Sequence, residues 1–143
     1  MRQDERSFFD LYAQNFARMA VAIPRVALAD PAANAREIVR LYDGAARDGA
    51  VVVLLPELAL SGDSLEDLHQ QETILRAVLK GLATVVEATR GRPSVLVVGA
   101  PLRFDSRLLN CAVVASRGRI LGIVPKSYVP SYREFSDRDP CWS

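Results

Sequence analysis

Blocks of apolar and polar residues alternate along the chain, and they predict strands interleaved with helices. A run of five apolar residues at 51–55 is typical of a strand that is buried on both faces. Further apolar runs at 19–28, 95–99, 108–115 and 120–124 predict four more strands. The Ser-Arg-Gly-Arg stretch between the last two runs is typical of a hairpin turn.

Helical spacing of apolar residues predicts three helices. Asp30 and Pro31 supply an N-cap acceptor and a proline at the first helical position, and Gly49 closes that helix. A long helix is predicted over most of 65–89, and a short amphipathic helix over 7–16. A strand, a helix and a second strand within about forty residues form a βαβ-like start, which predicts the α/β fold class.

Prolines follow three of the predicted strands, at Pro56, Pro101 and Pro125. Because proline cannot donate a hydrogen bond to a sheet ladder, each proline is expected to end its strand. Pro56 and Pro101 are then expected at the same rim of the sheet. Glu57 comes directly after Pro56, and Lys126 directly after Pro125. The sequence therefore predicts a carboxylate and an ammonium group at matching strand ends.

These two residues, with Glu134, are candidates for acid–base chemistry. A carboxylate with apolar neighbours is partly removed from water, which suits Glu57 as a general base. Glu134 follows Lys126 by eight residues. A lysine held between two carboxylates stays protonated and can stabilise a developing oxyanion. Taken singly, a loop or helix-capping glutamate and a surface lysine are the commoner outcomes.

The cysteines and the histidine offer no clear nucleophile or metal site. Cys111 lies in the middle of a predicted strand among alanine and valine, where a buried apolar role is the default. Cys141 follows Arg-Asp-Pro with no strand before it and is expected to be a free loop thiol. His69 lies in a polar stretch and is expected to be solvated. With no CxxC pair and no histidine cluster, no metal site is predicted.

Composition and charge narrow the class of protein. The chain has 143 residues, of which 50% are hydrophobic and 24% charged, as expected for one globular domain. A net charge of +1 gives no basis for binding nucleic acid or an anionic membrane. No apolar stretch approaches the roughly 20 residues needed to span a bilayer. Since the N-terminus also lacks a secretory signal, a reduced, cytoplasmic protein is expected.

Motifs in order along the chain resemble those of the nitrilase, or carbon–nitrogen hydrolase, superfamily. Leu-Pro-Glu-Leu around Glu57, with Ser-Gly behind it, resembles the glutamate motif. Val-Gly-Ala-Pro at 98–101, Leu-Asn-Cys-Ala-Val-Val at 109–114 and the following Gly-Arg-Ile resemble the central strands. Pro-Lys-Ser-Tyr-Val-Pro-Ser-Tyr-Arg-Glu-Phe from Pro125 resembles the lysine motif. The resemblance covers residues 8–138.

More narrowly, the chain resembles the glutaminase domains of the glutamine-dependent NAD synthetases. The resemblance rests on Ser-Gly-Asp-Ser-Leu-Glu-Asp-Leu at 61–68 and on the Tyr-Arg-Glu-Phe ending of the lysine motif. It implies a four-layered α-β-β-α sandwich, of which these residues would form the incomplete N-terminal part. One departure is Asp63, which stands where the synthetases usually carry an aromatic residue.

The resemblance also implies a Glu-Lys-Cys catalytic set. Glu57 would be the general base and Lys126 the oxyanion stabiliser. Glu134 would position the lysine, and Tyr132 would contact the substrate, L-glutamine. A cysteine thiolate would attack the glutamine side-chain amide, release ammonia and leave a glutamyl thioester for hydrolysis. That cysteine normally ends a later strand, so residues 1–143 alone are expected to be inactive and marginally stable.

In the synthetases, the ammonia passes to a separate domain that uses ATP and Mg to amidate an adenylated nicotinate dinucleotide. That domain is absent from these residues, so no cofactor is expected in this part. The family's members are usually homo-oligomers. Two alternatives stay open: a truncated stand-alone nitrilase-family amidase, and a catalytically dead interaction module of the same fold. The presence of both Glu57 and Lys126 argues against the dead module. Against the amidase, the Ser-Leu-Glu-Asp-Leu stretch and the segment from Phe8 to Phe16 argue for the synthetase, while Asp63 argues weakly against it.

Overall fold

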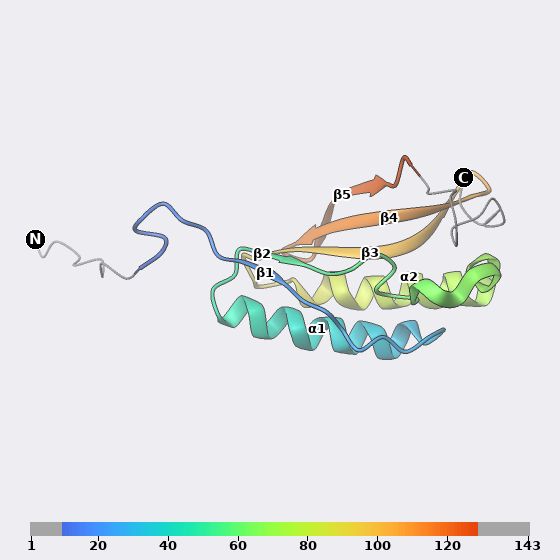
Figure 1. Ribbon diagram of the computed structural model, residues 1–143, viewed down its shortest axis with the longest axis horizontal. Helices are drawn as coiled ribbons and strands as arrows, with labels where there is room; N and C mark the ends of the chain where they lie inside the picture. Colours follow the sequence, from blue (N-terminus) through green and yellow to red (C-terminus); the bar gives the residue numbers. More distant parts are fainter. Residues whose placement is uncertain (1–9, 129–143) are drawn as a thin grey trace, which may run out of the picture.

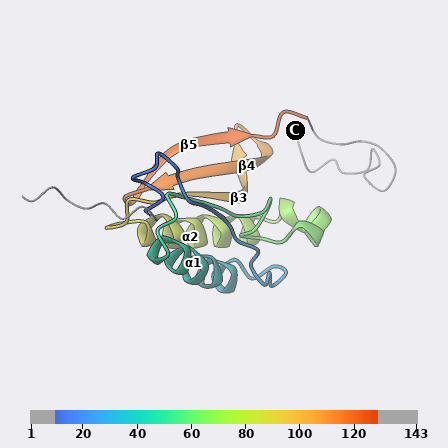
Figure 2. The same ribbon diagram turned by 60° about the vertical axis from the view of Figure 1, so that its left-hand side comes forward.

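A computed structural model describes residues 10–128, the side chain at position 66 excepted, and shows a single sheet with helices on one face (Figures 1 and 2). The two α-helices are α1 (Pro31–Arg47) and α2 (Glu72–Ala88), and a 3₁₀-helix, η1 (Asp63–Gln70), precedes α2. The strands are β1 (Met19–Val21), β2 (Val52–Leu54), β3 (Val95–Phe104), β4 (Arg107–Ser116) and β5 (Arg119–Pro125). The α/β class predicted from the sequence is confirmed.

The five strands lie in the sheet in chain order. β1, β2 and β3 are parallel to one another, with α1 and α2 as the crossovers between them. β4 and β5 continue the sheet as antiparallel hairpins. The turn between β4 and β5 places Arg117 and Gly118 at positive φ, 51° and 73°, as the predicted tight hairpin requires.

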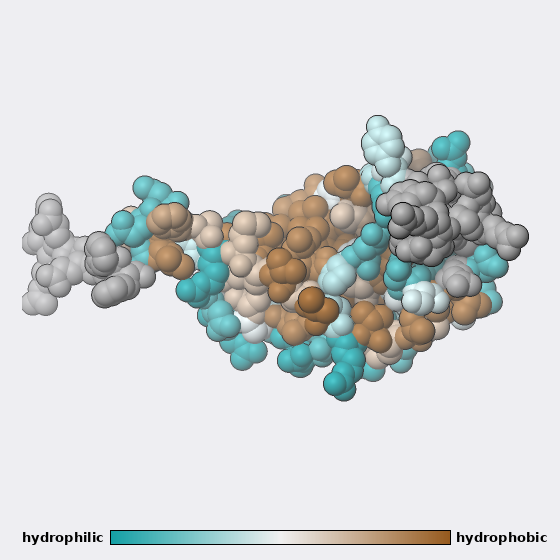
Figure 3. Space-filling model, viewed as in Figure 1, coloured by the Kyte–Doolittle hydropathy of each residue, from teal (hydrophilic) through white to brown (hydrophobic). Residues whose placement is uncertain are grey.

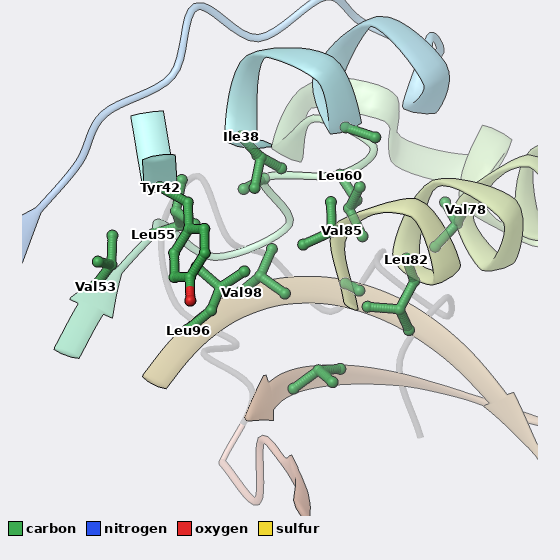
Figure 4. Packing of buried hydrophobic residues seen from close by; sticks show 14 of the residues in the cluster. Ile38, Tyr42, Val53, Leu55, Leu60, Val78, Leu82, Val85, Leu96 and Val98 are labelled. Atoms are coloured by element: carbon green, nitrogen blue, oxygen red, sulfur yellow. The ribbon is translucent and has the colours of Figure 1, made fainter. Parts of the chain in front are cut away.

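The core lies between the sheet and the two α-helices (Figure 4). α1 contributes Ile38 and Tyr42, and the Tyr42 hydroxyl donates to the Ser94 carbonyl at 2.9 Å, so its polar tip is satisfied inside the core. Further fully buried apolar side chains come from the strands, α2 and the loop after β2, among them Val53, Leu60, Val78, Val85, Leu96, Val98 and Val113. Each such side chain contributes about 1.5–3 kcal/mol by leaving water.

The opposite face of the sheet is not covered by any helix or strand among residues 10–128 (Figures 1 and 2). Adjacent residues of β2 show the contrast, because Val53 is fully buried whereas Leu54 is 43% exposed. Apolar side chains at the two edge strands, β1 and β5, are also exposed: Met19, Val21, Ile120, Leu121, Ile123 and Val124. Figure 3 shows apolar residues gathered across the middle of the molecule.

Two N-terminal predictions are wrong: the first strand is shorter than predicted, and a turn replaces the described part of the first helix. The first strand ends at Val21 and does not continue to residue 28, although the Ala22 amide still donates to the Leu54 carbonyl at 2.9 Å. Pro24, which cannot extend the ladder, is buried where the chain leaves the sheet. The described part of the helix predicted at 7–16 is a turn, and Phe16 of its expected apolar stripe is 66% exposed.

Two further predictions fail nearer the middle of the chain. The long helix expected over 65–89 is broken at Gln71, which is extended (φ −68°, ψ 125°) between η1 and α2. β3 also passes through Pro101, which was expected to end it. Opposite Pro101, the Asn110 carbonyl points toward β5 and accepts from the Lys126 amide at 2.8 Å. This pair therefore needs no ladder hydrogen bond between β3 and β4, and proline is tolerated.

Candidate active site

Glu57 and Lys126 come together at one end of the sheet. Glu57 follows β2, Lys126 follows β5, and the Lys126 Nζ donates to Glu57 Oε1 at 2.8 Å. The two groups are 69 positions apart in sequence and form an ion pair. The structure therefore joins the carboxylate and the ammonium that the sequence places at two strand ends.

The ion pair is more exposed than the apolar neighbours of Glu57 suggest. The Glu57 side chain is 49% exposed and that of Lys126 35%. Leu55 and Leu58, the flanking apolar residues, turn into the core and are 4% and 2% exposed. The expected desolvation of Glu57 is thus not met among the described residues, because its apolar neighbours point away from it.

The loop that carries Glu57 lies directly against β3 at Gly99. A Cβ at position 99 would lie 2.4 Å from the Leu58 nitrogen and 2.5 Å from the Pro56 oxygen. The loop then returns to the sheet, where the Leu60 amide donates to the Gly99 carbonyl at 3.3 Å. Glycine in the Val-Gly-Ala-Pro motif therefore permits a backbone approach that any other residue would block.

Two buried polar side chains hold the far end of this loop. Asn34 on α1 donates from Nδ2 to the Leu60 carbonyl at 3.0 Å. His69 on η1 places Nε2 at 3.2 Å from Ser61 Oγ and 3.1 Å from the Gly62 carbonyl. Asn34 and His69 are each 1% exposed, so the prediction of a solvated His69 is wrong. The histidine is buried because the 3₁₀-helix folds back onto the loop, which the polar pattern of its neighbours does not reveal.

Asn110 is the site residue to which sequence analysis assigns no role. Its Nδ2 donates a hydrogen bond to Glu57 Oε1, and its main-chain carbonyl accepts from the Lys126 amide at 2.8 Å. It is 9% exposed and lies on β4. Its signal in the sequence is that Asn110 interrupts the apolar run at 108–115 as its single polar residue.

Cys111, next to Asn110, does not serve as a nucleophile for the Glu57–Lys126 ion pair. The residue is 2% exposed, and burial raises the pKa of its thiol above the usual value. A neutral, buried thiol is unreactive, because the thiolate is the attacking species. The predicted buried role of Cys111 is confirmed.

Other candidates from the sequence fall outside the described residues. Tyr132, Glu134 and Cys141 all lie beyond residue 128. Within residues 10–128, no cluster of three His, Cys, Asp or Glu side chains could hold a metal ion. No helix of that same region is long and apolar enough to cross a bilayer.

A surface hollow of about 620 Å³ lies at the other end of the strands. Its lining includes Val95 at the start of β3 and Arg119 at the start of β5. Neither Glu57 nor Lys126 contributes to it, so the hollow is separate from the ion pair.

The chain matches a known protein family and known proteins over most of its length. The model of the carbon-nitrogen hydrolase family matches residues 18–139. The glutamine-dependent NAD(+) synthetase of Mycobacterium tuberculosis (strain ATCC 25618 / H37Rv) is 44% identical over 132 residues, which are 92% of this chain and 19% of that protein. The enzyme of the same name from Mycobacterium leprae is 43% identical over 131 residues, again 92% of this chain and 19% of that protein. The chain thus spans about a fifth of these relatives' length.

Solved structures share the fold. A glutamine-dependent NAD+ synthetase from Acinetobacter baumannii in complex with ADP has a TM-score of 0.75 and 22% identity, over 86% of this chain and 23% of that chain. A C145A mutant of the Nesterenkonia AN1 amidase from the nitrilase superfamily has a TM-score of 0.71 and 22% identity, over 80% of this chain and 44% of that chain. At this identity the likeness concerns the fold, and it shows that the chain holds part of a nitrilase-type domain.

Proposed function

The chain belongs to the carbon-nitrogen hydrolase family, and from that membership we propose that it is the N-terminal part of a glutaminase domain that releases ammonia from glutamine. The observation that carries the proposal is the 2.8 Å ion pair between the glutamate and the lysine of the two family motifs. The choice of glutamine rests on relatives named glutamine-dependent NAD(+) synthetase, which match 92% of the chain at 43–44% identity.

In the proposed reaction, Glu57 takes the proton of a cysteine thiol on a strand later in the sequence than these 143 residues. The thiolate attacks the side-chain amide carbon of glutamine, and Lys126 stabilises the negative charge that develops on the amide oxygen. Glu57 then returns the proton to the leaving nitrogen, the C–N bond breaks, and ammonia departs. Water hydrolyses the remaining thioester to glutamate. Tyr132 is proposed to contact glutamine, and Glu134 to hold the lysine.

The proposal extends to the fate of the ammonia. A separate synthetase domain, using ATP and Mg, would consume it to make NAD, in a cytoplasmic homo-oligomer. The 143 residues of this chain are proposed to need no cofactor of their own. The stand-alone amidase is the second candidate, because the Nesterenkonia amidase shares the fold, with a TM-score of 0.71 against 0.75 for the Acinetobacter baumannii synthetase. Its 22% identity concerns the fold alone, whereas the synthetase relatives are 43–44% identical.

The test compares the complete open reading frame that contains these residues with the 143-residue chain. The complete product is expected to release glutamate from glutamine, and the 143-residue chain to release none. Glu57→Gln and Lys126→Ala are each expected to lower kcat by about 10²- to 10⁴-fold, because a general base and an oxyanion stabiliser contribute on that scale.

Matched controls come from α2. Lys80→Ala and Glu87→Gln remove the same types of charge at exposed positions away from the ion pair, and both are expected to keep the unmodified rate. If the complete product carrying Glu57→Gln hydrolysed glutamine at the unmodified rate, that result would contradict the proposed function. Glutamate release by the 143-residue chain would contradict the assignment of the nucleophile to a later segment.

A further inference from the structure

We propose that Asn110 is a positioning residue that reserves one oxygen of Glu57 for the proton-transfer step. The inference rests on the proposed function, since it takes Glu57 as the general base. Asn110 Nδ2 and Lys126 Nζ both donate to the same carboxylate oxygen, Oε1. Within the described part of the chain, Glu57 Oε2 makes no hydrogen bond. Among residues 10–128, side chains therefore hold one oxygen of Glu57, and the other is open to the reacting thiol.

The position of Asn110 allows it to contact both Glu57 and Lys126. It is 9% exposed and lies in β4, which pairs with both β3 and β5, so its backbone position is fixed by the sheet. Its main-chain carbonyl accepts from the Lys126 amide at 2.8 Å, while its side-chain amide donates to Glu57. A single residue thus fixes both partners of the ion pair, one through the main chain and one through the side chain.

The side-chain amide of Asn110 directs the incoming proton to one of the two oxygens of Glu57. An asparagine side chain carries both a donor and an acceptor, and only the NH₂ group can face a carboxylate favourably. Two donors on Oε1 stabilise negative charge there through charge-assisted hydrogen bonds. A proton arriving at Glu57 therefore goes to Oε2. The S–H bond of the nucleophile breaks as the Oε2–H bond forms, and Oε2 later passes the same proton to the departing ammonia.

The kinetic test uses the complete open reading frame with two substitutions at this position. Asn110→Leu keeps the approximate volume and removes the donor, whereas Asn110→Asp keeps the shape and places a carboxylate against Oε1. Both are expected to lower kcat by about 10- to 100-fold, within the range of a misplaced general base, while KM for glutamine changes by less than about threefold. Val114→Ala, further along β4, is the control and is expected to keep kcat.

The Asn110→Asp variant also gives a readout that a purely structural role would not move. The Glu57 carboxylate beside it would raise the pKa of the introduced aspartic acid, since two neighbouring carboxylates resist ionising together. Once protonated, that aspartic acid can donate to Oε1 again, so the kcat of Asn110→Asp relative to the unmodified protein is expected to rise about tenfold between pH 8 and pH 5. A flat ratio, with kcat unchanged in Asn110→Leu, would overturn the positioning role. Loss of rate in Glu57→Gln combined with full rates in both Asn110 variants would overturn this inference alone. Full rate in Glu57→Gln would overturn the proposed function.

A measurement that leaves Asn110 in place covers the case in which its variants do not fold. In protein labelled with ¹⁵N-asparagine, Glu57→Gln is expected to shift the side-chain amide signal of Asn110. The signal of Asn34, which is buried but bonded to the Leu60 carbonyl, is expected to stay in place. An Asn110 signal that does not move would show that the amide does not bind Glu57, and the inference would be wrong.

Discussion

Gly99 shows how closely single residues control the Glu57 loop. An added Cβ would lie 2.4–2.7 Å from backbone atoms of Pro56, Glu57 and Leu58, and backbone cannot move aside as a flexible side chain would. We expect Gly99→Ala to lower the free energy of unfolding by about 1–3 kcal/mol, the range for overpacking, and to displace Glu57 from Lys126. Urea denaturation measures the first effect, and glutamine hydrolysis by the complete product measures the second.

Gly122 in β5 provides the matched control for Gly99. Both glycines lie in strands, yet nothing stands within 4 Å of a Cβ built at Gly122. Gly122→Ala is therefore expected to leave both stability and hydrolysis close to unmodified levels. Equal losses in the two variants would show that strand propensity, not the approach of the loop, explains the effect.

At the residue scale, the sequence predicted the ion pair but not what surrounds it. Pro56 and Pro125 mark the strand ends, and each is followed by a charged residue, so Glu57 and Lys126 could be proposed from chain order alone. Asn110 could not, because it lies inside β4 and not at a strand end, so only the pairing register decides whether it meets Glu57. Burial of His69 depends on the path of a 3₁₀-helix, which neighbouring polar residues do not specify.

At the scale of elements, the contact between α1 and α2 depends on a glycine in the second helix. A Cβ at Gly81 would lie 2.9 Å from the Pro31 carbonyl oxygen, at the start of α1, and 3.3 Å from the Leu60 side chain. Gly44 in α1 has nothing within 4 Å of its Cβ position. Replacing either glycine by alanine brings the same gain in helix propensity, about 1 kcal/mol. The two sites therefore separate helix propensity from helix packing.

We expect Gly44→Ala to raise the free energy of unfolding by up to about 1 kcal/mol, because the methyl group meets no obstacle. Gly81→Ala is expected to lower the free energy of unfolding by about 1–3 kcal/mol, since α2 must move away from the start of α1. Parallel thermal and urea unfolding of both variants checks the signs. Stabilisation by Gly81→Ala would mean that the two helices are not as closely packed as the structure shows.

Elements with strong end signals were predicted well from the sequence, and those without were not. α1 begins at Pro31 after an Asp30 N-cap, whose side chain accepts from the Ala33 amide at 2.9 Å. No such stop signal stands at Gln71, so η1 and α2 were predicted as one helix. Hydrophobic runs located each strand of residues 10–128, but the lengths of the strands depend on pairing. β1 has three residues because only these face β2 in register.

On the scale of the whole molecule, the helices of residues 10–128 cover one side of the sheet only. Within residues 10–128, α1 and α2 bury one face, and the other presents partly exposed apolar residues from β1 to β5. A two-layer arrangement of this kind leaves apolar surface in water that a soluble domain ordinarily buries. The resemblance to the family implied an incomplete part of a four-layered sandwich, and the matched share of the Nesterenkonia amidase chain, 44%, agrees with a partial domain.

Val53 and Leu54 test this view of the molecule, because they are neighbours on β2 that point to opposite faces. Val53 is 0% exposed in the core, and Leu54 is 43% exposed on the open face. We expect Val53→Thr to lower the free energy of unfolding by about 1–3 kcal/mol, since it places a hydroxyl in the core. Leu54→Thr is expected to change it by less than about 0.5 kcal/mol, as for an ordinary surface substitution.

Binding of a hydrophobic dye separates the two faces further. The folded chain is expected to bind such a dye on the open face, and Leu54→Thr to weaken that binding at unchanged thermal stability, because it removes apolar surface only there. Val53→Thr is expected to leave dye binding by the folded state unchanged, since its side chain is out of reach. Equal destabilisation by both substitutions, or dye binding indifferent to Leu54, would mean that the second face is already covered in solution.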